Sequence, residues 1–162
     1  MTKENFRFLF DSYFDTVRSY LFYRGAGMDE ASDLAQDVFL RLWEKQMEVE
    51  PKTALRLLYK IAGDMYISKY RRAKLEMNYL NSLQNENISR SPEDDLSHRE
   101  LFENYKKALA SLNEKQRTVF LMSRIEGLKY HEIAERLNLS VKAVEKRMNL
   151  TLTFLKKALQ TE

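Results

Sequence analysis

Residues 130–159, YHEIAERLNLSVKAVEKRMNLTLTFLKKAL, decide the fold. A short helical pattern over 130–137 is followed by a tight connection at Asn138 and Leu139. A second helical pattern then starts at Ser140, a residue type that commonly caps helix N-termini. Ala134 is small, which suits the close crossing of two consecutive helices. The stretch therefore predicts a helix-turn-helix.

The second of these helices has two different sides when residues are placed at about 100° each. Its apolar side is expected to enter the core and consists of Val141, Val144, Met148, Leu152, Leu155 and Leu159. Its polar side carries Lys142, Lys146, Asn149 and Thr153, flanked by Glu145 and Lys156. Exposed donors at the front of such a helix can enter the major groove of DNA, and an ordinary solvated helix is the alternative.

Within this segment the residues divide by their expected partners. Lys146 and Asn149 are expected to reach base edges, whereas Lys129, Arg136 and Lys142 are expected to hold phosphates. The complete set of expected DNA contacts is Lys129, Arg136, Ser140, Lys142, Glu145, Lys146, Arg147, Asn149 and Thr153.

The rest of the chain also favours helices. Only four glycines and two prolines interrupt the 162 residues, and alternating β-branched runs are missing. Apolar spacing predicts a first helix ending at Arg24–Gly27, a second with Asp29 as N-cap, and a third over Ala54–Lys74. The predicted fold class is therefore all-α. The expected core residues are Phe6, Phe10, Tyr13, Phe14, Val17 and Leu21 in the first helix; Ala31, Leu34, Ala35, Val38, Phe39 and Leu42 in the second; and Leu55, Leu58, Tyr59, Ala62 and Tyr66 in the third.

A change of composition divides the chain into two small domains. Residues 78–98 are rich in Asn and Ser, acidic, and without a sustained apolar stripe, which is typical of a linker. Ser97 and Glu100 have capping-box spacing and predict the start of a new helix. Asn113 repeats the signal for the next helix, which is expected to stop at Gly127. The predicted organisation is a domain over 1–77, a linker over 78–98 and a domain over 99–162.

Composition and charge limit the class of protein. Hydrophobic residues make up 44% and charged residues 31% of the chain, as in folded soluble proteins. There is no cysteine, no signal-peptide pattern at the N-terminus and no apolar run long enough to span a membrane, so a cytoplasmic protein without membrane insertion is expected. The segment 99–162 has 13 basic and 8 acidic side chains, a surplus of +5 that suits a polyanionic partner.

Leu40 stands out on the second helix. It lies opposite the expected core, among Asp37, Arg41 and Glu44, with Asp33 one turn further away. A leucine ringed by charges on a solvent face indicates an anchor for a partner protein, and a single harmless exposed leucine is the alternative.

The third helix carries a basic stripe away from its apolar side. Arg56, Lys60, Arg71 and Lys74 form the stripe, and Gly63 on the same side would admit a close backbone. The segment 56–74 has six basic residues against one acid, which fits a nucleic-acid backbone; a solvated helix end is the alternative.

These features together resemble a known family. The stretch DLAQDVFLRLWE at 33–44 resembles the polymerase-binding helix of sigma-70-type factors. At the distance expected for that family, it is followed by SLNEKQRTVFLMSRIEGLKYHEIAERLNLS at 111–140. The whole chain is similar to the compact extracytoplasmic-function subgroup over roughly 6–76 and 99–160. Either half alone would be less specific, because many regulators contain a helix-turn-helix.

The resemblance implies a transcription initiation factor that carries core RNA polymerase to promoters. The first domain would bind the clamp coiled coil of the largest polymerase subunit, the loop 46–53 would capture a flipped base of the minus-10 element, and the third helix would contact nearby DNA. The second domain would read the minus-35 element and meet the polymerase flap, and the acidic linker would thread toward the RNA exit path. The implied polymerase-binding positions are Asp33, Gln36, Asp37, Leu40, Arg41 and Glu44. The implied minus-10 positions are Pro51, Lys52, Thr53, Arg56, Lys60, Gly63, Asp64, Arg71, Arg72 and Lys74.

The resemblance also implies an anti-sigma factor that holds the protein inactive. The chain departs from the family in the third helix, where many members carry Arg-Asn and a later Asp, and where this sequence has Gly63, Asp64 and Ser68. It also lacks the tryptophan cluster of housekeeping relatives, which implies stringent promoter choice. The minus-10 contacts of this chain are therefore expected to differ from those of its relatives.

Other function classes have less support. The two histidines, His98 and His131, form no metal motif, and there is no phosphate-binding loop or nucleophile constellation, so no catalytic residue, metal or cofactor is expected. A free-standing helix-turn-helix regulator that binds operator DNA predicts a receiver or ligand-binding domain, and the sequence has no α/β pattern for one. A helical adaptor that binds only proteins is a third alternative, and salt-sensitive DNA binding would argue against it.

Overall fold

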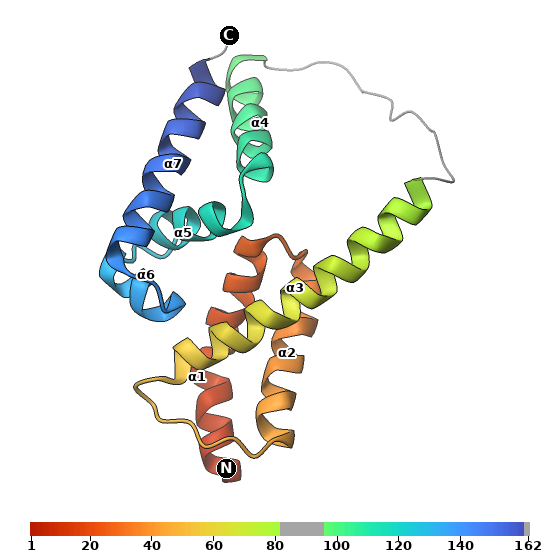
Figure 1. Ribbon diagram of the computed structural model, residues 1–162, viewed down its shortest axis with the longest axis vertical. Coiled ribbons are helices and arrows are strands. Elements are labelled where there is room, and N and C mark those ends of the chain that lie inside the picture. The colour runs from red at the N-terminus through yellow and green to blue at the C-terminus, as the bar shows by residue number, and fades with distance from the viewer. Residues whose placement is uncertain (82–95, 161–162) are drawn as a thin grey trace.

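The computed structural model describes the backbone of residues 1–81 and 96–160, and the side chains of 1–71 and 99–160. Every regular element in these ranges is a helix, and two helical groups lie next to each other (Figure 1). The predicted all-α class is confirmed. No helix in these ranges is both long and apolar enough to cross a bilayer.

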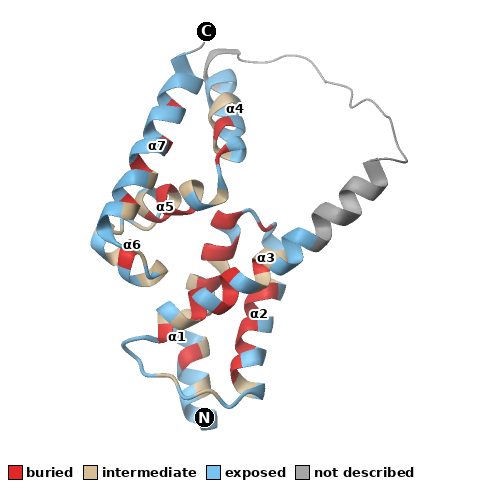
Figure 2. Cartoon of the chain, in the orientation of Figure 1, coloured by how far each residue is buried: buried red, intermediate tan, exposed pale blue. Residues whose placement is uncertain are grey.

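The N-terminal domain consists of α1 (Lys3–Arg24), α2 (Met28–Glu44) and α3 (Ala54–Asn81). All six core residues predicted for α2 are buried, because they share one side of an amphipathic helix. In α1 the buried set includes Leu9 and Tyr20, which sequence reasoning missed, while Phe6 and Phe10 are only partly buried. Phe10 meets the buried Phe39 edge-on, with ring centroids 5.2 Å apart. Figure 2 shows the buried residues of the three helices facing one another.

Two helix boundaries in this domain differ from the prediction. The N-cap of α2 is Gly27, whose N–H donates to the Glu30 carboxylate at 3.4 Å, so Asp29 lies in the first turn and is not the cap. The third helix continues to Asn81, past the predicted end at Lys74 and into the first four residues of the predicted linker. No glycine or proline occurs between 64 and 91, so the chain contains no strong stop signal there.

The C-terminal domain consists of α4 (Leu96–Ser111), α5 (Glu114–Arg124), α6 (Tyr130–Leu137) and α7 (Val141–Gln160). Because α4 begins at Leu96, Ser97 lies inside that helix and does not precede it. The predicted cap of α5 is confirmed: Asn113 accepts a hydrogen bond from the Lys115 N–H at 2.9 Å. The same helix ends at Arg124, before the expected stop at Gly127.

The helix-turn-helix is confirmed as α6 and α7. The connection turns at Asn138, which has the left-handed values φ 54° and ψ 48°. The Leu139 N–H donates to the carbonyl of Ala134 at 2.9 Å, and Ser140 Oγ caps α7 by accepting from the Ala143 N–H at 3.1 Å. These bonds satisfy backbone groups at the end of α6 and at the start of α7.

The buried side of α7 is rotated slightly from the prediction. Val144, Met148 and Leu155 are buried as expected, but Thr151 takes the place assigned to Leu152, which is 38% exposed. Thr151 is tolerated inside because its hydroxyl donates to the carbonyl of Arg147 at 2.7 Å. The expected core residues Val141 and Leu159 are also exposed, since they lie near the two ends of the helix.

Asn138 provides a test of the turn. Replacing it by Gly should leave the free energy of unfolding unchanged or slightly higher, because glycine adopts left-handed angles freely. Replacing it by Val should lower that free energy by about 1–2 kcal/mol, the cost of forcing a side chain branched at Cβ into this region. Urea unfolding followed by circular dichroism measures both. Since Asn138 is exposed, equal stabilities for the two variants would contradict the proposed role of its backbone geometry.

The two domains are in contact. In the arrangement shown in Figure 1, α1 packs against α5 and α3 packs against α6. Helix α7 also contacts α4, α5 and α6 within its own domain. The first turns of α3, which carry Arg56 and Lys60, therefore face the helix-turn-helix domain.

Candidate functional site

The outer side of α2 is a surface of charged side chains around one leucine. Leu40 is 52% exposed, while its neighbours Val38 and Phe39 on the other side of the helix are fully buried. We call this the polymerase face, after the partner that the sequence resemblance implies. Its residues, all exposed, are Asp33, Gln36, Asp37, Leu40, Arg41 and Glu44. The predicted exposure of Leu40 is confirmed, and the buried inner side of α2 fixes the orientation of this face.

The polar side of α7 is also open to solvent. Lys142, Lys146, Asn149 and Thr153 are all exposed, and we call them the recognition face. Glu145 is exposed beside this face, and Ser140 and Lys129 are exposed near the start of the helix-turn-helix. The buried stripe of Val144, Met148, Thr151 and Leu155 on the opposite side holds this face outward.

Two arginines predicted to contact DNA are turned toward the N-terminal domain. Arg136 is half-buried and donates from Nη1 to the Tyr59 hydroxyl at 3.4 Å. Arg147 is half-buried beside Tyr20 and Arg24, and burial lowers the pKa of its guanidinium. In this arrangement neither side chain belongs to the exposed recognition face.

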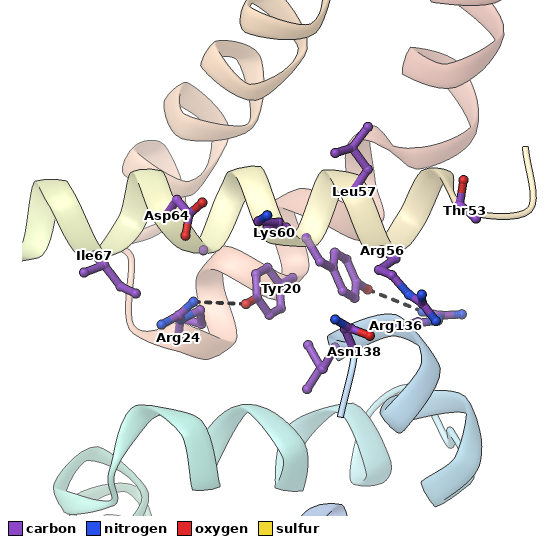
Figure 3. A pocket seen from close by; sticks show the side chains of 13 residues that line it. Tyr20, Arg24, Thr53, Arg56, Leu57, Lys60, Asp64, Ile67, Arg136 and Asn138 are labelled. Atoms are coloured by element: carbon purple, nitrogen blue, oxygen red, sulfur yellow. Dashed lines mark hydrogen bonds between the residues drawn. The ribbon is translucent and has the colours of Figure 1, made fainter. Parts of the chain in front are cut away.

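Four of the predicted minus-10 residues of α3 line a cavity of about 640 Å³ between the domains (Figure 3). One wall of the cavity is formed by Thr53, which precedes α3, and by four residues of α3: Arg56, Lys60, Gly63 and Asp64. The facing wall is the end of α6, where Arg56 Nε donates to the Glu135 carbonyl at 3.4 Å. We call Arg56, Lys60 and Gly63 the α3 basic face.

Three other predicted minus-10 residues, Pro51, Lys52 and Arg71, do not line this cavity. Pro51 and Lys52 are exposed in the loop before α3, and Arg71 is exposed further along the helix. The side chains of Arg72 and Lys74 lie outside the described residues.

Sequence reasoning missed the residue at the centre of the interdomain contact. Arg24 is the last residue of α1, and its side chain is 8% exposed. Its Nη2 lies 2.7 Å from a carboxylate oxygen of Glu114 on α5, and its Nη1 donates to the Tyr20 hydroxyl at 3.0 Å. Burial would lower the pKa of Arg24, but hydrogen bonds and charge interactions with Glu114 and Tyr20 raise it overall. The partners are 90 positions apart, so no local pattern indicates the pair.

A second arginine strengthens the same contact. Arg117 of α5 donates from Nε to the Tyr23 carbonyl at 2.9 Å and from Nη2 to the Arg24 carbonyl at 2.5 Å. These carbonyls belong to the last turn of α1, where backbone acceptors lack partners within the helix. A cation placed there also interacts favourably with the helix dipole. The C-terminal domain therefore caps a helix of the N-terminal domain.

Glu126 is a titratable group without a full set of partners. Its Oε2 atom is buried and accepts no hydrogen bond from the described residues. Burial raises the pKa of this carboxyl above its ordinary value, and the charge of Arg136 offsets part of the rise. The ionised form is thus less stable in the folded protein than in the unfolded chain.

This carboxyl predicts a specific dependence of stability on pH. Because its folded pKa is raised, its contribution to stability is fully present below the ordinary pKa of 4.5 and is lost as pH rises through the folded value. As pH rises through this range, the wild type should therefore lose stability, whereas Glu126→Gln, which has no carboxyl group there, should not. The free energy of unfolding of the variant minus that of the wild type should increase. Urea unfolding of both proteins at several pH values measures the difference. A difference that stays constant with pH would contradict the assignment.

Comparisons with known proteins identify the family. A family model described as sigma-70, region 4, matches residues 102–155. The chain is 32% identical over 143 residues to the ferric citrate uptake sigma factor FecI of Escherichia coli K12, covering 87% of this chain and 83% of the relative. It is 29% identical over 154 residues to the RNA polymerase sigma factor YlaC of Bacillus subtilis, covering 92% and 88%.

Solved structures show the same fold. The sigma factor RpoE of Bartonella quintana, solved with the anti-sigma factor NepR, superposes with a TM-score of 0.64 at 21% identity, covering 98% of this chain and 99% of that chain. CnrH, solved with the cytosolic domain of CnrY, gives 0.59 at 22%, covering 99% and 91%. The all-helical fold, the match to sigma-70 region 4 and the extended identity to FecI agree: this chain belongs to the extracytoplasmic-function type of sigma-70 factors, which are transcription initiation factors.

Proposed function

We propose that this chain binds core RNA polymerase through the polymerase face and directs it to promoters by contacting a minus-10 element with its first domain and a minus-35 element with its second. The observation that carries the proposal is the pairing, in one chain, of the exposed Leu40 on α2 and the exposed recognition face on α7. The α2 face suits a protein partner and the α7 face suits DNA. A factor that brings polymerase to promoters needs both kinds of surface.

The polymerase face has the properties of a protein anchor. Leu40 offers an apolar side chain, and exposed acidic and basic residues surround it. Interfaces concentrate their binding energy in a few central residues, while a charged rim sets specificity and association rate. The clamp coiled coil of the largest polymerase subunit is the partner that we propose for this face, and the flap for the second domain.

The α3 basic face, with the loop residues Pro51, Lys52 and Thr53 before it, is the proposed minus-10 surface. Arg56 and Lys60 supply the charge that holds a phosphate backbone. Asp64 and Gly63 stand where many relatives carry Asn and Arg, so we propose that this chain selects a different minus-10 sequence. Arg71, Arg72 and Lys74 extend the surface along the helix.

The recognition face of α7 is the proposed minus-35 reader. Lys146 and Asn149 are spaced to reach neighbouring base edges, and lysine and asparagine pair well with guanine and adenine acceptors and donors. Lys129 and Lys142 would fix the register on the phosphates. Ser140, Glu145 and Thr153 lie beside them and complete the proposed minus-35 surface. Arg136 and Arg147 would join this surface once the two domains separate.

We also propose that the chain acts in the cytoplasm and is held inactive by an anti-sigma factor. The sigma factor RpoE, which has the same fold, was solved with the anti-sigma factor NepR, and CnrH was solved with the cytosolic domain of CnrY. An inhibitor that competes with polymerase for the faces described above would account for such control.

Reconstitution tests the proposed function. The purified chain is mixed with bacterial core polymerase and genomic DNA, and transcripts are mapped to their start sites. We expect starts that depend on this chain and share two upstream motifs. If the chain binds DNA but never associates with core polymerase, under conditions where a housekeeping sigma factor does, the proposal is wrong.

A further inference from the structure

Arg24 lies against the α3 basic face although it belongs to α1. A Cβ atom built on Gly63 would be 2.6 Å from Arg24 Nη1 and 3.2 Å from the Tyr20 hydroxyl. The guanidinium therefore rests directly on the backbone of α3, in space that only a glycine leaves free. It lines the same cavity as Arg56 and Lys60, and Figure 3 shows Arg24 and Tyr20 beneath the helix that carries Lys60.

The contacts that hold Arg24 in place come mostly from its own domain. Its Nη1 bonds to Tyr20, and its guanidinium carbon lies 5.7 Å from the ring centroid of Tyr20 and 5.2 Å from that of Tyr66. From the C-terminal domain, the carboxylate of Glu114 pairs with the guanidinium, and Arg117 donates to the backbone carbonyl of Arg24. If the domains separate, Arg24 keeps its position on α3 and loses its anionic partner.

The separated guanidinium is open to water on the side that Glu114 covered, and its positive charge favours another negatively charged oxygen at the vacated position. A phosphate oxygen suits a guanidinium at least as well as a carboxylate does, because both accept charge-assisted hydrogen bonds. Arg56 and Lys60 on the same wall add to the positive potential there, and Asp64 reduces it only in part.

We infer that Arg24 is a phosphate-binding residue of the minus-10 surface, and that Glu114 occupies the position of a promoter phosphodiester when the two domains are in contact. This inference rests on the proposed function, since it assigns a further DNA contact to the surface proposed above. Arg24 cannot hold both anions, so contact between the domains and contact with DNA exclude each other at this residue. Arg56 shows the same competition, since it is bound to the Glu135 carbonyl of α6.

Two variants of one ion pair separate this role from a purely structural one. Glu114→Gln weakens the interdomain contact and leaves Arg24 available, so holoenzyme should bind a labelled promoter fragment more tightly, by several-fold. Arg24→Gln breaks the same pair but removes the phosphate contact, so binding should weaken about tenfold. The slope of log affinity against log salt should also fall by about one for Arg24→Gln. Fluorescence anisotropy with full-length protein and core polymerase measures both quantities.

The exchanged pair Arg24→Glu with Glu114→Arg is the matched control. It restores opposite charges across the domains but puts an acid on the DNA surface, so the fold and thermal midpoint should recover while promoter affinity stays low. If Glu114→Gln and Arg24→Gln change promoter affinity in the same direction, Arg24 acts only through the interdomain contact and the inference is wrong. An unchanged salt slope in Arg24→Gln would overturn it as well. A failure of the wild-type chain to bind core polymerase would instead reject the proposed function itself.

Discussion

Leu40→Asp is expected to weaken binding of this chain to core RNA polymerase at least about 30-fold, which corresponds to a loss of about 2 kcal/mol at a central interface residue. The substitution removes an apolar anchor and places an unpaired carboxylate where the partner surface would exclude water. Asp37 and Glu44 are neighbours on the same face and would add like-charge repulsion. Because Leu40 is half-exposed in the isolated chain, the fold should be unaffected.

Phe8→Asp is the matched control for this prediction. Phe8 is 56% exposed on α1 of the same domain, and its replacement makes the same change from an apolar to an acidic side chain away from α2. Its affinity for core polymerase should stay close to that of the wild type. Affinities are measured by titrating labelled core polymerase, with circular dichroism to check folding. Full promoter-dependent transcription by Leu40→Asp would show that the polymerase face is assigned wrongly.

Features encoded by local patterns were predictable from the sequence. All six α2 core positions, the exposure of Leu40 and the turn between α6 and α7 follow from helical spacing, a cap residue and a left-handed asparagine. The helix ends were less predictable, because they depend on competition between several possible caps. The N-cap of α2 is Gly27 and not the predicted Asp29. Helix α3 continues past its predicted end to Asn81, because no glycine or proline interrupts it there.

The contact between the domains could not be predicted from spacing. Arg24 is paired with Glu114, 90 positions away, and Arg117 caps the end of α1 by bonding to Tyr23, 94 positions away. From the sequence, Gly63 is expected only to admit a close backbone. In the structure, an arginine side chain from α1 fills this space. Such pairings depend on tertiary packing, and one sequence contains no periodic signal for them.

The three proposed surfaces differ in how open they are in this arrangement. The polymerase face and the recognition face are exposed, whereas the α3 basic face borders α6 across the interdomain cavity. The first two faces are therefore accessible without rearrangement. The proposed minus-10 contact, and the addition of Arg136 and Arg147 to the proposed minus-35 surface, require that the two domains separate. We expect this order of accessibility to make polymerase binding the step that precedes full promoter contact.

Lys146→Ala is expected to weaken binding of the holoenzyme to a minus-35 element by about 10- to 100-fold, the range for losing one specific contact to a base edge. The effect should depend on sequence: a promoter altered at the contacted base pair should lose most of the difference between wild type and variant. Asn149→Ala should act in the same way at a neighbouring base pair, since the two residues lie on one face of α7. Neither change should alter affinity for core polymerase, because the polymerase face lies on the other domain.

Lys107→Ala is the matched control, since it removes one exposed lysine from α4 of the same domain and leaves α7 unchanged. It should reduce promoter affinity only slightly and equally for all sequences, as expected for a diffuse charge effect. Anisotropy titrations with matched and altered minus-35 fragments at fixed salt compare the three variants. If Lys146→Ala loses the same affinity for every promoter sequence, this lysine contacts a phosphate and not a base. Asn149 and its other neighbours on the recognition face would then contact the bases.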